Sequence, residues 1–136
     1  EWLVSQSCVF HYNDMNVLSM HALIGAYSGE GQEWADELCS VLSENINYAY
    51  EFILKNFPGV SVSRPQGTYM MFLHCEDYCR KAGITQKELL HRGWDVGVAW
   101  QDGEAFHDPW GIRMNFALPH SLVVEAMERL REHVFL

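Results

Sequence analysis

The sequence predicts an α+β fold in which a small, mostly antiparallel sheet carries helices on one face. Two changes of hydrophobic period predict it. Apolar residues recur with the helical period of about 3.6 residues from Gln32 to Phe57. After Pro58 they alternate with polar residues in several short segments, which is the period of a strand. A last helical pattern follows Pro119, so helices flank the strands at both ends.

The first part of the chain is expected to hold one apolar helix. Residues 1–14 show no regular period and are expected to be irregular, with Asn13 or Asp14 as the N-cap of the next helix. That helix, Met15–Tyr27, is apolar almost all round and needs burial on every side. A chain of 136 residues can hardly supply this cover, so some of its side chains are expected to pack against another copy or to form an exposed patch. These side chains are Leu18, Leu23 and Ile24.

The remaining elements follow from turn signals and periods. Ser28–Gly31 is predicted to be a turn, and Gln32–Phe57 a long helix that ends at Pro58-Gly59. Two strands, a short helix with a capping box, two further strands and a terminal helix are expected next. In order, they are Val60–Val62, Thr68–His74, Thr85–His91, Trp94–Trp100, Ile112–Leu118 and a helix that begins at Pro119. Because Thr68–His74 is apolar on both faces, it is expected to be a central strand.

The composition excludes several classes of partner. The net charge is −9, from 9 basic and 18 acidic residues, and no basic run is present. Neither a nucleic acid nor an anionic membrane is therefore expected as a partner. No apolar stretch approaches the ~20 residues that span a bilayer, and the N-terminus lacks the basic region of a signal peptide. The first residue is Glu1 rather than Met, which suggests that coding sequence upstream has been removed.

The four cysteines and seven histidines do not show the spacing of a metal site. The nearest approach is His74-Cys75-x-x-x-Cys79, which lacks a second pair of ligands. No metal site is expected, and Cys75 is expected to lie in the core. Disulfide frameworks are typical of smaller, more cysteine-dense secreted chains, so reduced thiols in a cytoplasmic protein are predicted.

The segment Ile112–Leu118 holds the strongest candidate for a binding residue. If its apolar residues face one way, Arg113, Asn115 and Ala117 face the other. An arginine in mid-strand keeps its charge and needs water or an anion, and its planar fork matches a carboxylate. The pattern also fits the commoner case of an arginine on a solvated sheet face that pairs with Asp or Glu, with Asn115 as a solvated neighbour. The residues alone leave both interpretations open.

Two other segments hold candidate neighbours of a site. The loop Trp100–His107 lies between two predicted strands and contains Gln101 and Asp102. Such loops often carry function, although a surface loop without a role fits as well. Gly67, in the turn Arg64–Gly67, would allow close approach of the backbone to a ligand, or merely a tight turn. No phosphate-binding loop, nucleophile elbow or Ser/His/Asp arrangement is found.

Five strings of residues, in order along the whole chain, form a recognisable set. They are Asn16–Ala22, Glu33–Leu38, Pro65–Tyr69, Gly97–Gly103 and Ile112–Pro119. The Gly-Thr-Tyr turn and the Arg-x-Asn-x-Ala strand are the most specific parts. Together the strings resemble the C-terminal third of fold-type I enzymes that depend on pyridoxal phosphate (PLP), in the subgroup of cystathionine β-lyase-like aminotransferases.

The resemblance implies roles for several parts of the chain. The arginine that matches Arg113 holds the α-carboxylate of the amino-acid substrate, and the loop Gln101–His107 borders the substrate entrance. Tyr12–Asn16 would lie near the interface of a homodimer. Residues 1–31 would be a remnant of the large cofactor-binding domain, residues 32–57 a long interdomain helix, and residues 58–136 the C-terminal small domain.

The chain departs from the family pattern because it lacks a match to the catalytic lysine, which the family carries upstream of the first string. Lys55, Lys81 and Lys87 lie in the wrong contexts. The aspartate and the phosphate cup that hold PLP are also expected upstream. The resemblance therefore implies PLP in the full-length enzyme, no catalytic residue in these 136 residues, and a fragment that neither binds PLP covalently nor turns over substrate. It leaves transamination and β-elimination open.

Two functions of other classes also fit the sequence. The chain could be a free-standing α+β module that recognises small carboxylates through Arg113 without catalysis. It could also be an oligomerisation domain in which Met15–Tyr27 is the contact helix.

Overall fold

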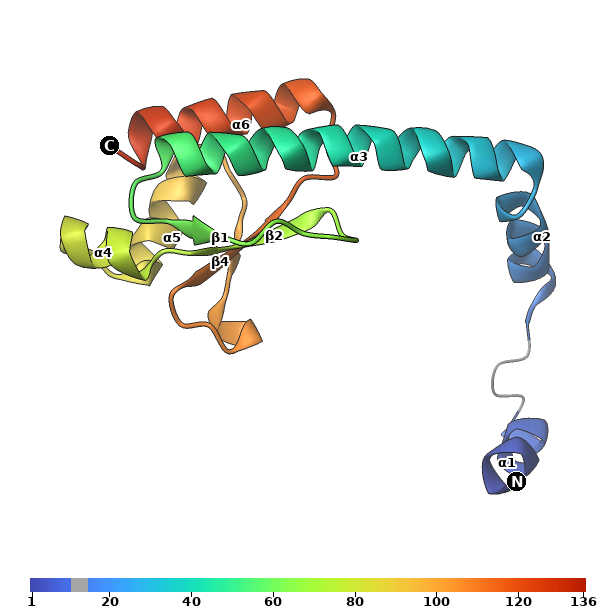
Figure 1. The fold of residues 1–136 in the computed structure, drawn as a ribbon. Coiled ribbons are helices and arrows are strands. Elements are labelled where there is room, and N and C mark those ends of the chain that lie inside the picture. Colours follow the sequence, from blue (N-terminus) through green and yellow to red (C-terminus); the bar gives the residue numbers. More distant parts are fainter. Residues whose placement is uncertain (11–14) are drawn as a thin grey trace. The chain divides into compact units, whose positions relative to one another are not determined.

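The structure, a computed structural model, describes residues 1–10 and 15–136 of the chain. These residues divide into two units, Glu1–Leu38 and Cys39–Leu136. Figure 1 labels the helices and strands of the two units. No helix within the described ranges is both long and apolar enough to cross a membrane.

The first unit contains two short helices, of which the sequence predicted one. Helix α1 spans Trp2–Phe10, so the expectation of an irregular segment was wrong there; this segment contains neither glycine nor proline to prevent a helix. Helix α2 spans Val17–Ala26, and its N-cap is Asn16, whose Oδ1 accepts a hydrogen bond from the backbone N–H of Ser19 at 2.9 Å. The expected caps, Asn13 and Asp14, lie outside the described residues.

Helix α2 has no buried residue. Leu18, Leu23 and Ile24 are exposed to 82%, 46% and 62%. In the single chain these three apolar side chains are therefore uncovered, which is the starting point of both expected outcomes, contact with another copy and an exposed patch.

Helix α3 runs from Gly29 to Asn56 and begins three residues earlier than predicted. The hydroxyl of Ser28 accepts a hydrogen bond from the backbone N–H of Gly31 at 3.1 Å, so this serine opens the helix where a turn was expected. In the second unit, α3 buries one stripe against the sheet. The buried residues of this stripe are Asn45, Ile46, Ala49 and Ile53.

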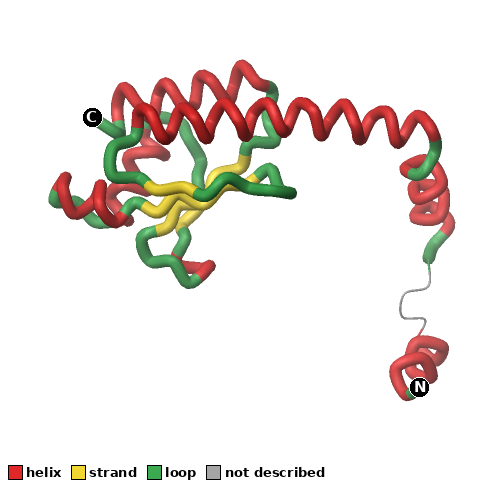
Figure 2. Tube along the Cα trace, in the orientation of Figure 1, coloured by secondary structure: helices red, strands yellow, loops and turns green. Residues whose placement is uncertain are grey.

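Four antiparallel strands form one sheet in the order β1-β2-β4-β3. The strands are β1 (Ser61–Val62), β2 (Met70–His74), β3 (Gln101–Asp102) and β4 (Gly111–Asn115). The expectation that β2 is central is confirmed. Helices α3 and α6 (His120–His133) pack on one face of this sheet, and Figures 1 and 2 show both helices on the same side. The predicted fold class is thus confirmed.

The third predicted strand, Trp94–Trp100, was wrong. Trp94 belongs to helix α5 (Gln86–Asp95), which Thr85 and Glu88 open with the predicted capping box. After α5 the chain turns at Gly97, whose φ of 79° favours glycine, and pairing with β4 starts only at Gln101. The large residue at the end of this segment is explained by packing instead. The indole of Trp100 is buried against Gly93, where a Cβ atom would come within 2.2 Å of it.

Helix α4 (Glu76–Ala82) was not predicted. No element was expected between His74 and Thr85, but the charges of this segment follow the helix dipole, with acidic residues in the first turn and basic ones in the last. Gly83 ends the helix in the left-handed conformation, with φ of 66°. These signals were present in the sequence.

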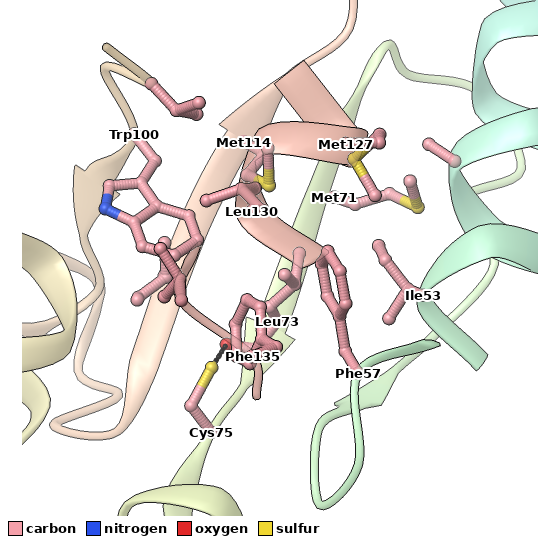
Figure 3. Packing of buried hydrophobic residues seen from close by; sticks show 14 of the residues in the cluster. Ile53, Phe57, Met71, Leu73, Cys75, Trp100, Met114, Met127, Leu130 and Phe135 are labelled. Atoms are coloured by element: carbon pink, nitrogen blue, oxygen red, sulfur yellow. Dashed lines mark hydrogen bonds between the residues drawn. The ribbon is translucent and has the colours of Figure 1, made fainter. Parts of the chain in front are cut away.

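One hydrophobic core fills the space between the sheet and the helices (Figure 3). Its aromatic centre is Phe135, which stacks on Phe57 and contacts the edges of Tyr78 and Trp100. Cys75 is fully buried in this core, as expected, and burial raises the pKa of its thiol far above the ordinary value. Leu118 is exposed, contrary to the predicted alternation, because β4 ends at Asn115.

A fully buried polar residue, Asn45, joins α3 to the end of β4. Its side-chain Nδ2 donates to the carbonyl oxygens of Phe116 (3.0 Å) and Leu118 (2.8 Å). Its Oδ1 lies 2.9 Å from Nδ1 of His120, at the start of α6. One amide therefore holds three elements together at the point where the chain leaves the sheet.

We expect Asn45→Ala to lower the free energy of unfolding by about 2–3 kcal/mol, because it leaves two carbonyl groups without their partner. Urea denaturation measures this difference. The matched control is Ser40→Ala, at an exposed position of the same helix, which should change the free energy of unfolding by no more than about 0.5 kcal/mol. Equal effects of the two substitutions would contradict the role assigned to Asn45.

Candidate functional site

The sheet of the second unit has one covered face and one open face. Met71, Leu73, Ile112 and Met114 point to the core and are buried. The alternate residues of β2 and β4 point to the other face. These open-face residues are Met70, Phe72, His74, Gly111, Arg113 and Asn115.

Strand pairing places Arg113 in the middle of the open face. It lies opposite Phe72 of β2 and opposite Gln101 of β3. Its Nε donates to Oε1 of Gln101 at 2.8 Å, and its Nη2 donates to the same oxygen. Gln101 is therefore in direct contact with the Arg113 guanidinium.

An aromatic ring covers one face of the Arg113 guanidinium. The Cζ atom of Arg113 lies 4.3 Å from the ring centroid of Phe106, a distance typical of a cation–π contact. Phe106 belongs to the short 3₁₀ helix Glu104–Phe106 and meets the ring of Phe72 edge-on at 5.4 Å. Phe106 lies in the predicted loop but was not among the predicted site residues; a large aromatic residue in a polar loop was the available signal.

The charge of Arg113 has no acidic counterpart in this part of the chain. Among the described residues, no carboxylate forms an ion pair with its guanidinium, and its contacts are a neutral amide and an aromatic ring. The side chain is half-buried, so an anion that reached it would meet a charge partly shielded from water. The alternative of a salt bridge to Asp or Glu is not what these residues show.

The other predicted neighbours lie in different surroundings. Asn115 is exposed at the end of β4, and its Oδ1 accepts from the backbone N–H of Ala117 at 2.8 Å. The carboxylate of Asp102 forms hydrogen bonds within the fold: its Oδ1 accepts from the side chain of Gln86 (3.1 Å) and from the backbone N–H of Glu104 (2.9 Å). Both residues thus form hydrogen bonds within the segments beside Arg113 and not with Arg113 itself.

Gly67 lines a separate groove of about 460 Å³ between α3 and the turn before β2. A Cβ atom at this glycine would meet nothing within 4 Å. The position therefore has room, but the residues that line this groove do not include Arg113. The structure does not bring Gly67 and Arg113 together in one pocket.

A second charged group lies on the open face, beside Gly111. His74 Nδ1 is 3.0 Å from Asp108 Oδ2, and His74 Nε2 is 3.5 Å from Glu76, which also pairs with Arg80. The hydrogen bond to Asp108 raises the pKa of His74 above its ordinary value, against the opposing effect of burial. Burial acts to raise the pKa of Asp108, but hydrogen bonds from His74 and the Trp110 backbone outweigh it and hold this pKa low.

None of the three lysines, all of which lie among the described residues, has a buried amine. Lys55, Lys81 and Lys87 are all exposed, in the helices α3, α4 and α5. Lys87 lies 3.9 Å from Glu104. Lysines that hold a cofactor are usually desolvated or placed beside another cation, and none of the three has this environment.

Comparison with known proteins gives a consistent result. No family model matches the sequence. The chain is 29% identical over 120 residues to cystathionine β-lyase PatB of Bacillus subtilis, and 25% identical over 122 residues to an aspartate aminotransferase of the same organism. Each match covers 86% of this chain and 30% of the relative.

Among solved structures, the PLP-bound C–S lyase from Staphylococcus hominis shares the fold with a TM-score of 0.82 and 24% identity. The match covers 96% of this chain and 34% of the lyase. The chain matches the C-terminal part of a fold-type I PLP-dependent enzyme.

This fold-type I match confirms the resemblance found in the sequence and the α+β fold class. The chain spans about a third of the length of the relatives it matches. The predicted domain boundaries at residues 31 and 57 remain predictions, as do the roles of Arg113, Asn115, Gly67, Gln101 and Asp102.

The pair of His74 and Asp108 should make stability depend on pH. A histidine whose pKa is raised in the folded state stabilises the fold when protonated, and this contribution is lost as pH rises above 6.5 through the raised value. Asp108 contributes above its ordinary pKa of 3.8 and loses this contribution as pH falls through its lowered value. We therefore expect His74→Gln to cost most near about pH 5.5 and least near about pH 9.

Since the His74 side chain is 44% exposed, this cost should not exceed about 1 kcal/mol. Urea denaturation of the parent chain and of His74→Gln across this pH range measures it. Repeating the comparison in an Asp108→Asn background provides the control, where most of the pH dependence should disappear. A cost that stays constant from acid to alkaline pH would show that the pair does not contribute in this way.

Proposed function

We propose that this chain is the C-terminal part of a PLP-dependent aminotransferase or carbon–sulfur β-lyase that acts on an amino acid, with Arg113 as the residue that binds the substrate's α-carboxylate. The observation that carries the proposal is the position of Arg113 on the open sheet face, held by a neutral amide and a ring. The names of the relatives include both reaction types. The described residues favour neither.

The contacts of Arg113 suit a carboxylate. A guanidinium that is held in place and partly shielded from water binds a planar carboxylate more strongly than a freely moving one, because less conformational entropy is lost. Two parallel N–H···O bonds also fix the orientation of the bound acid. Arg113 would thus orient the amino acid by its carboxylate. The bond that breaks in the reaction would then lie in a defined position.

The cofactor belongs in our proposal to the full-length protein. PLP, when bound, supplies the stabilisation of negative charge at the substrate's Cα. The described residues do not fit the task of holding it, since all three lysines are exposed and the arginine of the open face is assigned to the substrate. We therefore place the PLP-holding residues outside residues 1–136, in agreement with the third of the relatives' length that this chain covers.

The domain roles form part of the same proposal. Residues 1–31 would belong to a large cofactor-binding domain, residues 32–57 to an interdomain helix, and residues 58–136 to the small domain. The exposed apolar residues of α2 support this division, because such a surface requires cover from another part of the protein or from a second copy. We also propose a homodimer, as the family resemblance implies, and a cytoplasmic location, as the cysteine pattern predicts.

We expect Arg113→Ala in the full-length, cofactor-loaded protein to lower kcat/KM for its amino-acid substrate by about 100-fold or more, because the charge-assisted bonds to the carboxylate are lost. L-cystathionine and L-aspartate are the first substrates to test. The matched control is Arg131→Ala, an arginine of α6 that pairs with Glu128 and Glu132, which should retain nearly full activity. Unchanged kinetics of Arg113→Ala would refute the carboxylate assignment.

The 136-residue chain by itself should not react with PLP at a specific lysine. On addition of PLP we expect no new visible absorbance band that depends on one of Lys55, Lys81 and Lys87. Three single Lys→Arg variants, compared with the parent chain, provide the test. A band that disappears in one variant alone would mean that these residues contain a cofactor site, contrary to the proposal.

A further inference from the structure

The hydrogen bonds of Arg113 use one particular edge of its guanidinium group. An arginine can bind an acid in a bidentate manner through the edge formed by Nε and Nη2, or through the edge formed by Nη1 and Nη2. Oε1 of Gln101 accepts from both Nε and Nη2. The first edge is therefore occupied by a neutral oxygen of this chain.

The second edge remains available. Among the described residues, Nη1 of Arg113 donates to no protein group, and the ring of Phe106 covers a face of the guanidinium rather than an edge. A carboxylate can consequently form two parallel hydrogen bonds with Nη1 and Nη2 while Gln101 stays where it is.

The backbone of Gln101 is held in place by the elements around it. Its backbone pairs directly with that of Arg113. The next residue, Asp102, accepts from Gln86, and Nε2 of Gln86 also donates to the carbonyl oxygen of Gly111 at 3.0 Å. Because Gln86 is buried, this amide links α5, β3 and β4 and fixes the point from which the Gln101 side chain extends.

We propose that Gln101 is a positioning residue of the carboxylate site: it occupies the Nε/Nη2 edge of Arg113 and presents the Nη1/Nη2 edge to the substrate's acid group. This inference rests on the proposed function of Arg113. A neutral amide suits the role, because it orients the guanidinium without cancelling its charge. A glutamate at the same place would form an internal ion pair and compete with the ligand.

The test measures the binding of propionate, a carboxylate without an amino group, to the full-length, cofactor-loaded protein by isothermal titration calorimetry. Propionamide, which lacks the charge, serves as the ligand control. We expect Gln101→Ala to weaken propionate binding about tenfold, the scale of one hydrogen bond to a charged group. Gln101→Glu should weaken it by about 100-fold or more. Gln32→Ala, at an exposed glutamine of α3, should bind propionate as the parent does.

A spectroscopic measurement separates positioning from general loss of structure. In protein labelled with ¹⁵N-arginine, the Nε–H signal of Arg113 is identified by its absence in Arg113→Lys. If Gln101 keeps its edge, saturating propionate should leave this signal nearly unmoved and should shift the Nη signals of the same residue. In Gln101→Ala, the Nε–H signal should shift even without ligand.

The outcomes distinguish the two proposals. Tighter propionate binding by Gln101→Ala, or a large shift of the parent's Nε–H signal on binding, would mean that Gln101 is displaced by the ligand, and would overturn the positioning role. Unchanged binding by Gln101→Ala together with lost binding by Arg113→Ala would overturn that role alone. Binding that survives Arg113→Ala would overturn the proposed function as well.

Discussion

The antiparallel pairing of β2 with β4 is the constraint on which the rest of the second unit depends. Its register sets Leu73 opposite Ile112 on the covered face, and Phe72 opposite Arg113 on the open face. A shift by one residue would move the apolar set out of the core and would bury the guanidinium charge against α3 and α6. The burial of the hydrophobic core and the display of the single central arginine are therefore consequences of one register.

Around this pairing, two buried polar side chains lie where secondary-structure elements meet. Asn45 joins α3 to the end of β4, and Gln86 joins α5 to β3 and β4. Both amides are buried and hydrogen-bonded, so each fixes a crossing of elements that apolar packing alone would leave adjustable. The loop of Phe106 is held from two sides, by Asp102 and by the pair of Asp108 and His74. The site is thus supported by the same bonds that define the fold.

Local signals predicted elements well and their ends less well. The capping box of Thr85 was correct, and so was the helix that begins near Pro119. The strand expected at Trp94–Trp100 was wrong: Trp94 ends a helix and is exposed to 47%, whereas Val98 and Trp100 are buried after the turn at Gly97. Helix α4 was missed although its charge order and its terminal glycine indicated it. In each case the competing signal was tertiary packing or a cap, not hydrophobic period.

By itself, the sequence determined the fold class, the family resemblance and the one charged residue in the middle of an otherwise apolar strand. The fold class and the charged residue are properties of single segments and their order, which hydrophobic period reveals. The resemblance rests on five strings of residues in the family's order. Only the tertiary structure decided which neighbours Arg113 has: Gln101 on one edge, Phe106 on one face, and no carboxylate among the described residues. Side-chain neighbours across a sheet depend on the register between strands that are distant along the chain, and no local pattern specifies that register completely.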